Sequence, residues 1–121
     1  MPKKILIADD DNGILDALKL ILEESDYEVE VTENGKDLLK LNDQLPDLIL
    51  LDIWMSGIDG KVVCQHLKNN PSTLNIPIIM ISANRDTAHI AKEAGADDYI
   101  LKPFDMEELL DKIDRHLVAE N

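Results

Sequence analysis

Short apolar runs alternate with longer amphipathic stretches along the whole chain. Runs of this length, bounded by turn residues, predict β-strands. Strands are expected at residues 4–8, 28–32, 48–52, 77–82 and 98–101. Strands that alternate with helical stretches form the βα pattern of a parallel sheet covered by helices on both faces.

Between the predicted strands, apolar side chains recur every three or four positions, which indicates amphipathic helices. Pro71 ends the third helical stretch, and Gly95 follows the fourth in the position that glycine often takes after a helix. The last helix has a clear start, because Asp105 stands three residues before Glu108 as in a capping box. Helices are expected at residues 12–24, in a short stretch that holds Leu38, Leu39 and Leu41, at 60–69, at 86–94, and from 105 to 117.

These elements predict an α/β fold, a three-layer αβα sandwich whose crossovers are right-handed. The chain has 121 residues, of which 45% are hydrophobic, and this suffices for one domain with its own core. Residues 1–121 are therefore interpreted as a single domain. Two organisations stay open, a free-standing protein and a piece of a longer one, and Met1 together with an end just past the last predicted helix suits the former.

Charge and composition exclude several classes of function. A net charge of −13 with no basic stripe would repel a phosphate backbone, so direct nucleic-acid binding is not expected. There is no apolar run of about 18 residues and no signal peptide, which predicts a cytoplasmic protein that does not enter a membrane. Cys64 is the only cysteine, so an intrachain disulfide cannot form.

Three carboxylates stand where two predicted strands end. Asp9 and Asp10 follow the apolar run 5–8, and Asp52 closes the run 48–51. If both runs are strands of one parallel sheet, the acids converge on one edge. Neighbouring strands lie ~4.8 Å apart, so the negative charges repel one another unless a cation sits among them.

Two further strands end in groups that complement the acids. The run 78–81 leads into Ser82, and the run 99–101 leads into Lys102 and Pro103. Ligands of open α/β sheets bind beyond the carboxyl ends of the strands. Three acids, a hydroxyl and an amine at such an edge predict a place for a hard cation and a phosphoryl group.

On these residues, the chain from Lys4 to about Leu117 resembles the receiver domain of two-component response regulators. The resemblance implies a flavodoxin-like, CheY-like sheet of strand order 2-1-3-4-5, in which strand 1 lies beside strand 3. It also implies a cis bond between Lys102 and Pro103. The matching residues are the acidic pair Asp9 and Asp10, the phosphoacceptor Asp52, the switch hydroxyl Ser82 and the lysine Lys102.

The chain departs from the family at Ser56, where receivers usually have proline, so the stiffness of the loop after the phosphoacceptor is in question. For the metal, the resemblance implies Mg²⁺, or Mn²⁺ in its place. Asp10, Asp52 and the backbone carbonyl of Trp54 would bind it directly, and Asp9 either directly or through water. The alternative is that the acids only cap the first helix, and we favour that role for Asp11 and the asparagine after it.

By the same resemblance, Asp52 accepts a phosphoryl group from a sensor histidine kinase or a histidine phosphotransfer protein. Lys102 would neutralise the phosphoryl oxygens and Ser82 would hydrogen-bond to them. The protein would then catalyse only its own phosphorylation and dephosphorylation, and is not otherwise expected to be an enzyme.

Movement of the loop after Ser82 would let Tyr99 turn inward and remodel helix 4, strand 5 and helix 5, where a downstream protein would bind. Trp54 and Asn84 would tune the lifetime of the phosphorylated state. Alternatively, Tyr99 is a half-buried strand aromatic without a switching role, and Trp54 packs on the neighbouring helix. We expect a monomer or a weak homodimer.

Three rival functions stay open. A Mg²⁺-dependent phosphatase of the haloacid dehalogenase type also uses aspartate nucleophiles, but it would need a longer chain with a cap and a late acidic pair. A flavodoxin-like electron carrier would need a Ser/Thr/Gly-rich phosphate loop where Asp9, Asp10 and Asp11 stand. The third rival is a receiver-like interaction module that is not phosphorylated.

Overall fold

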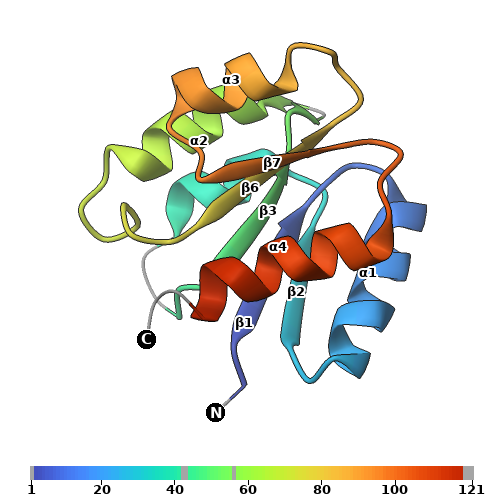
Figure 1. Ribbon diagram of the computed structural model, residues 1–121. Helices are drawn as coiled ribbons and strands as arrows, with labels where there is room; N and C mark the ends of the chain where they lie inside the picture. The colour runs from blue at the N-terminus through green and yellow to red at the C-terminus, as the bar shows by residue number, and fades with distance from the viewer. Residues whose placement is uncertain (1, 42–43, 56, 119–121) are drawn as a thin grey trace.

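The computed structural model describes residues 2–41, 44–55 and 57–118, and these form a five-stranded parallel sheet of order β2-β1-β3-β6-β7 (Figure 1). The predicted order 2-1-3-4-5 is confirmed, because β6 and β7 are the fourth and fifth strands of this sheet. Each strand agrees with its predicted range to within one residue. The strands are β1 (Lys4–Ala8), β2 (Glu28–Thr32), β3 (Leu48–Asp52), β6 (Ile78–Ser82) and β7 (Asp98–Leu101).

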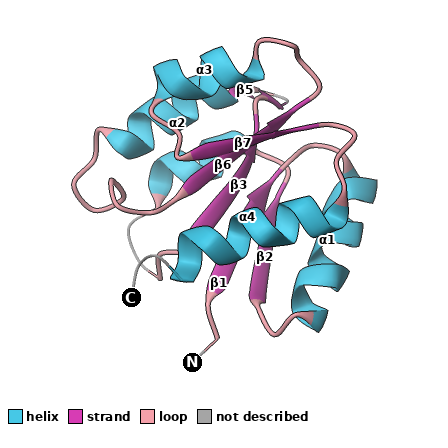
Figure 2. Ribbon diagram, in the orientation of Figure 1, coloured by secondary structure: helices cyan, strands magenta, loops and turns pink. Residues whose placement is uncertain are grey.

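Helices cover both faces of this sheet: α1 and α4 lie on one face, α2 and α3 on the other (Figures 1 and 2). The short second helix is a 3-10 helix that begins at Gly35 and ends before Leu41, so it starts earlier than its leucines indicated. No helix in the described ranges is long and apolar enough to cross a membrane. The helices are α1 (Asn12–Glu24), η1 (Gly35–Lys40), α2 (Gly60–Lys68), α3 (Thr87–Ala94) and α4 (Met106–Val118).

The alternation of side chains along the central strand β3 explains the three layers. All five residues of β3 are buried. Leu48 and Leu50 point into the core shared with α1 and α4, while Ile49 and Leu51 point into the core shared with α2 and α3. Successive strand side chains face opposite sides of a sheet, so an unbroken apolar run is what a strand buried on both faces requires.

Asp11 and Asp105 accept backbone hydrogen bonds at the starts of α1 and α4, and a glycine follows α3 as predicted. The Asp11 carboxylate accepts a hydrogen bond of 2.9 Å from the backbone N–H of Gly13, which confirms its role as the cap of α1. Asp105 accepts one of 2.9 Å from the N–H of Glu107 in the first turn of α4. Gly95 follows α3 with a φ of +85°, a left-handed conformation that glycine adopts at little cost.

A small feature that the sequence analysis missed follows β3 directly. Two-residue strands β4 (Trp54–Met55) and β5 (Ile58–Asp59) pair antiparallel and lead into α2. The N–H of Gly60 donates to the carbonyl of Ile53 at 2.7 Å, which closes this segment. A Cβ at Gly60 would overlap the carbonyl oxygen of Asp52, so the close return of the chain requires glycine here.

Candidate functional site

The parallel register brings the ends of β1 and β3 side by side. Ala8 lies opposite Leu51, so Asp9 and Asp52 each follow at the same edge of the sheet. The backbone N–H of Asp9 donates to the carbonyl of Thr32 at 3.1 Å and continues the ladder with β2 past the end of β1. The predicted convergence of the acids at the carboxyl edge is therefore observed.

Asp9, Asp10 and Asp52 form an acidic triad. One oxygen of each carboxylate lies within 4.8 Å of the others, which is close enough for a single metal ion to bind all three. Asp9 is 1% exposed and Asp52 5% exposed, whereas Asp10 lies at the surface. The triad thus has two buried members and one that faces solvent.

Lys102 contacts two members of this triad. Its Nζ lies 3.0 Å from Oδ2 of Asp9 and 3.8 Å from Oδ2 of Asp52. The backbone N–H of Lys102 donates to the carbonyl of Ser82 at 2.9 Å, and the bond to Pro103 is cis, as the resemblance implied. This backbone contact fixes the lysine at the strand end.

The charges at the site are not balanced by Lys102 alone. The pKa of Asp52 is raised from 3.8 to about 6, first by burial and then by the neighbouring Asp9, while Lys102 and the Trp54 N–H act in the opposite direction. The Asp9 carboxylate already accepts 2.9 Å and 3.0 Å bonds from the Asp11 N–H and from Lys102. A cluster that resists full ionisation in this way fits a site for a hard cation.

Ser82 ends β6 next to the triad and is 1% exposed. Its Oγ accepts a 3.0 Å hydrogen bond from the backbone N–H of Asn84. The Asn84 side chain in turn accepts a 2.7 Å hydrogen bond from the backbone N–H of Asp86, and the backbone carbonyl of Asn84 accepts a 2.5 Å hydrogen bond from Oγ1 of Thr87. The hydroxyl of Ser82 is therefore tied to the loop that leads into α3.

Trp54 lies at the rim of the site. Its backbone N–H donates to Oδ1 of Asp52 at 3.3 Å, and 56% of the residue is exposed. This exposure agrees with a rim position and not with packing on a neighbouring helix. Ser56, where the chain departs from the family, lies outside the described residues, so the expectation about loop stiffness stays a prediction.

Tyr99 lies apart from the triad and is 37% exposed on β7. The Nζ of Lys112 lies 5.9 Å from the centre of its ring, and the same ammonium pairs with Asp98 at 3.1 Å. His116 also contacts Asp98, at 3.0 Å. Burial raises the pKa of Asp98, but the hydrogen bonds from His116, the Tyr99 N–H and Lys112 outweigh it and hold the pKa below its usual value.

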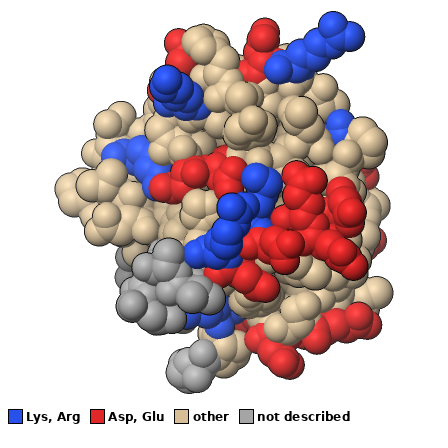
Figure 3. Space-filling model, in the orientation of Figure 1, with Lys and Arg blue, Asp and Glu red and all other residues tan. Residues whose placement is uncertain are grey.

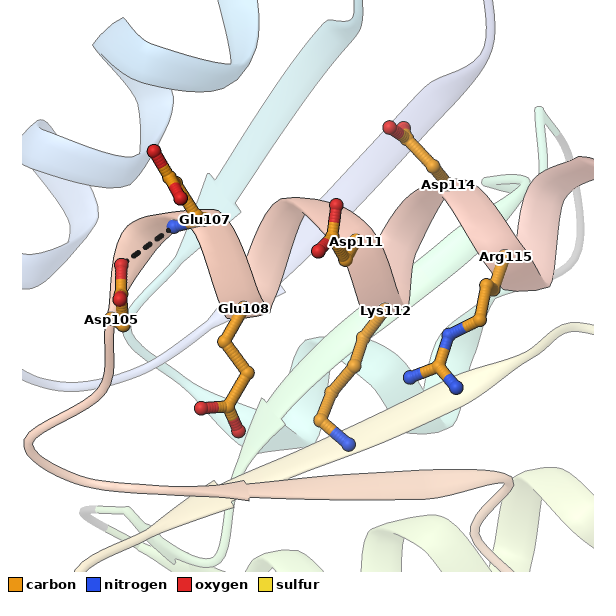
Figure 4. Close-up of a pocket in the computed structure, with 7 residues that line it drawn as sticks. All are labelled: Asp105, Glu107, Glu108, Asp111, Lys112, Asp114 and Arg115. Atoms are coloured by element: carbon orange, nitrogen blue, oxygen red, sulfur yellow. Dashed lines mark hydrogen bonds between the residues drawn. The ribbon is translucent and has the colours of Figure 1, made fainter.

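A hollow of about 640 Å³ runs along α4, and none of its lining residues belongs to the triad (Figure 4). Acidic side chains gather on the face that carries this helix (Figure 3). In Figure 4 the side chains leave the helix in different directions and do not converge on one point, so this hollow is not the candidate site. Its lining residues are Asp105, Glu107, Glu108, Asp111, Lys112, Asp114 and Arg115.

The strand order and the acidic edge define a flavodoxin-like α/β domain with a candidate cation site. A family model described as response regulator receiver domain matches residues 5–114. The chain therefore belongs to the response regulator receiver domain family, as its sequence resemblance predicted.

Individual relatives agree with this assignment. The chain is 40% identical to the DNA-binding dual master transcriptional regulator RpaA of Synechocystis over 93% of its own length and 48% of that protein. It is 42% identical to the nisin biosynthesis regulatory protein NisR of Lactococcus lactis over 99% of its length and 52% of that protein. The chain thus spans about half the length of the curated relatives it matches.

Solved structures show the same fold. A putative response regulator from Chloroflexus aurantiacus is 35% identical, with a TM-score of 0.90 over 98% of this chain and 99% of that chain. The chemotaxis response regulator CheY4 of Vibrio cholerae is 27% identical, with a TM-score of 0.88 over 97% of this chain and 100% of that chain. The CheY-like architecture is confirmed over almost the whole length.

Proposed function

We propose that this domain is a phosphorylation-controlled receiver: Asp52 accepts a phosphoryl group from a histidine kinase or a histidine phosphotransfer protein, and the modified domain controls a protein partner. The observation that carries the proposal is the convergence of Asp9, Asp10, Asp52 and Lys102 at one edge of the sheet. Membership of the receiver family supports it.

Mg²⁺, or Mn²⁺, would be held by Asp10 and Asp52, by the backbone carbonyl of Trp54, and by Asp9 directly or through water. When bound, such an ion supplies positive charge that neutralises the reacting oxygens. The fit rests on the three carboxylates whose oxygens lie within 4.8 Å of one another. No wider enzymatic activity is proposed.

In the transfer step, an oxygen of Asp52 forms a bond to phosphorus while the P–N bond of the donor phosphohistidine breaks; the electron pair of that bond goes to the ring nitrogen, and the ring leaves as neutral imidazole with the proton already on its other nitrogen. The product is an acyl phosphate on Asp52. Lys102, whose ammonium lies 3.8 Å from this carboxylate, would neutralise the new phosphoryl oxygens. Asp9 positions that ammonium through their 3.0 Å contact.

Ser82 is the proposed sensor of the phosphoryl group. Its Oγ accepts from the N–H of Asn84, so its own O–H can donate to a phosphoryl oxygen. A shift of Ser82 would pull the loop before α3, which makes room for Tyr99 to turn inward and changes the surface of α3, β7 and α4. Asn84 and Trp54 would adjust how long the phosphoryl group persists.

Intact mass spectrometry tests the proposal directly. The protein is incubated with acetyl phosphate, with excess Mg²⁺ or with a chelator, and we expect one phosphoryl group to be added only when Mg²⁺ is present. Asp52→Asn should abolish the adduct, and Asp16→Asn, which changes an exposed carboxylate on α1, should not. An adduct that persists in Asp52→Asn contradicts the assignment. Continued turnover of added phosphomonoesters would instead favour the phosphatase, and an unmodified wild type the interaction module.

A further inference from the structure

A groove of about 390 Å³ lies beside the acidic triad. Asp10 belongs both to the triad and to the wall of this groove, so the groove leads directly to the candidate site. The other lining residues come from the turn after β2, from the start of η1 and from the turn between β4 and β5. The complete lining is Asp10, Glu33, Asn34, Lys36 and Gly57.

The local structure places Lys36 in this groove. The side chain of Asn34 caps η1 by accepting a 3.0 Å hydrogen bond from the backbone N–H of Lys36. Gly57, which also lines the groove, has a φ of +87°, a conformation that favours glycine. The Cε of Lys36 lies 4.0 Å from the position that a Cβ of Gly57 would occupy, so the lysine stem extends toward that turn.

The positive charge of Lys36 affects how an anionic phosphodonor approaches the site. An anionic phosphodonor that approaches the site meets three carboxylates, Glu33 in the groove and a chain of net charge −13. Lys36 is the cation among the five residues that line the groove. Charges separated by less than a Debye length of about 8 Å at physiological ionic strength still interact, so an anion that enters the groove is attracted by this ammonium.

We propose that the groove is the approach path for small anionic acyl phosphates, and that Lys36 is the positioning residue that attracts the donor before transfer to Asp52. The proposal rests on the proposed phosphorylation of Asp52. Lys36 does not take part in the bond changes. Its charge raises the rate of productive encounter, while the oxygen of Asp52 still displaces the acetate of the donor.

The test compares the second-order rate constant of acetyl phosphate transfer, followed by intact mass at saturating Mg²⁺, in wild type and Lys36→Glu. We expect about a tenfold loss at low ionic strength, at the lower end of electrostatic rate effects, and a much smaller loss at 1 M salt, where the Debye length is about 3 Å. Lys36→Arg should retain the wild-type rate. Lys40→Glu, the same charge change at the other end of η1, is the matched control.

A second phosphodonor distinguishes electrostatic attraction of the donor by Lys36 from a structural change caused by the substitution. Phosphoramidate carries less negative charge than acetyl phosphate, so Lys36→Glu should slow its transfer less. Equal losses with both donors, a loss that does not depend on salt, or the same loss in Lys40→Glu would overturn the proposal for Lys36. A wild type that adds no phosphoryl group would instead refute the function proposed for Asp52.

Discussion

Replacing Asp52 with asparagine should stabilise the fold at pH 8 when divalent cations are removed. The carboxylate of Asp52 is buried beside Asp9, and the closer partner of Lys102 is Asp9, at 3.0 Å against 3.8 Å. Asparagine has nearly the same shape and no charge. The substitution therefore removes a buried charge that the native contacts do not fully compensate.

The raised pKa sets the size of this effect. The pKa of Asp52 rises from 3.8 to about 6, chiefly through burial and then through Asp9. A difference of about two pKa units corresponds to about 3 kcal/mol at 1.36 kcal/mol per unit, and this is an upper estimate. A net gain of about 1–3 kcal/mol is expected, because the asparagine amide must still find hydrogen-bond partners.

The sign of the pH dependence follows from the same shift. Below pH 3.8 the carboxyl is protonated in both the folded and the unfolded chain, so its ionisation does not change the unfolding free energy there. Between pH 3.8 and about 6 the unfolded chain loses the proton first, and the stability of wild type falls as pH rises. The gain in unfolding free energy of Asp52→Asn over wild type should therefore grow as pH rises through this window and reach its full size above it.

Urea denaturation of both proteins between pH 4 and pH 8 measures the difference in unfolding free energy. Asp16→Asn controls for the general loss of one negative charge, and it should show little change across the window. Added Mg²⁺ should stabilise wild type more than Asp52→Asn and so narrow the gap. A difference that stays constant from pH 4 to pH 8, or a variant less stable than wild type at pH 8, would refute the reasoning.

Three further outcomes are expected. Lys102→Ala should slow phosphorylation of Asp52, whereas Ser82→Ala should leave the adduct but weaken partner binding; equally small effects in both assays would remove these residues from the site. Gly60→Ala should lower the unfolding free energy by about 1–3 kcal/mol, because its Cβ meets backbone that cannot move freely, and an unchanged urea midpoint would argue against that contact. Trp54 emission should shift on adding Mg²⁺ and again with beryllofluoride, and Trp54→Ala should shorten the phosphorylated state; an emission spectrum indifferent to both ligands would assign this residue no part in the site.

The strands and the acidic edge were predictable because both depend on short stretches of sequence. A strand that is buried on both faces needs an unbroken apolar run, as in β3. Such a run can be recognised in the sequence without knowledge of distant residues. The position of Asp52 at the end of that run then fixes its place in the fold. The convergence with Asp9 required only that β1 and β3 be neighbours, which the family resemblance supplied.

Contacts that depend on packing were not predictable in this way. Asp98, Lys112 and His116 meet only because α4 lies against β7, and nothing in their spacing indicates a shared carboxylate. The β4 and β5 pair is too short to produce a period-two pattern. Its one sequence signal is Gly60, whose need for close approach to Asp52 becomes visible only in three dimensions.

The geometry of Lys102 connects the chemistry of the site to its proposed output. The ammonium lies closer to Asp9, at 3.0 Å, than to Asp52, at 3.8 Å, and a phosphoryl group on Asp52 would place new negative charge beside it. An ammonium has three N–H donors, so Lys102 can bind a phosphoryl oxygen and keep its 3.0 Å contact with Asp9. The backbone N–H of Lys102 is bonded to the carbonyl of Ser82, and the Ser82 hydroxyl accepts from the N–H of Asn84, so a shift of this strand end would also move the loop that precedes α3. These backbone contacts are therefore the route by which the proposed modification would reach the surface of α3.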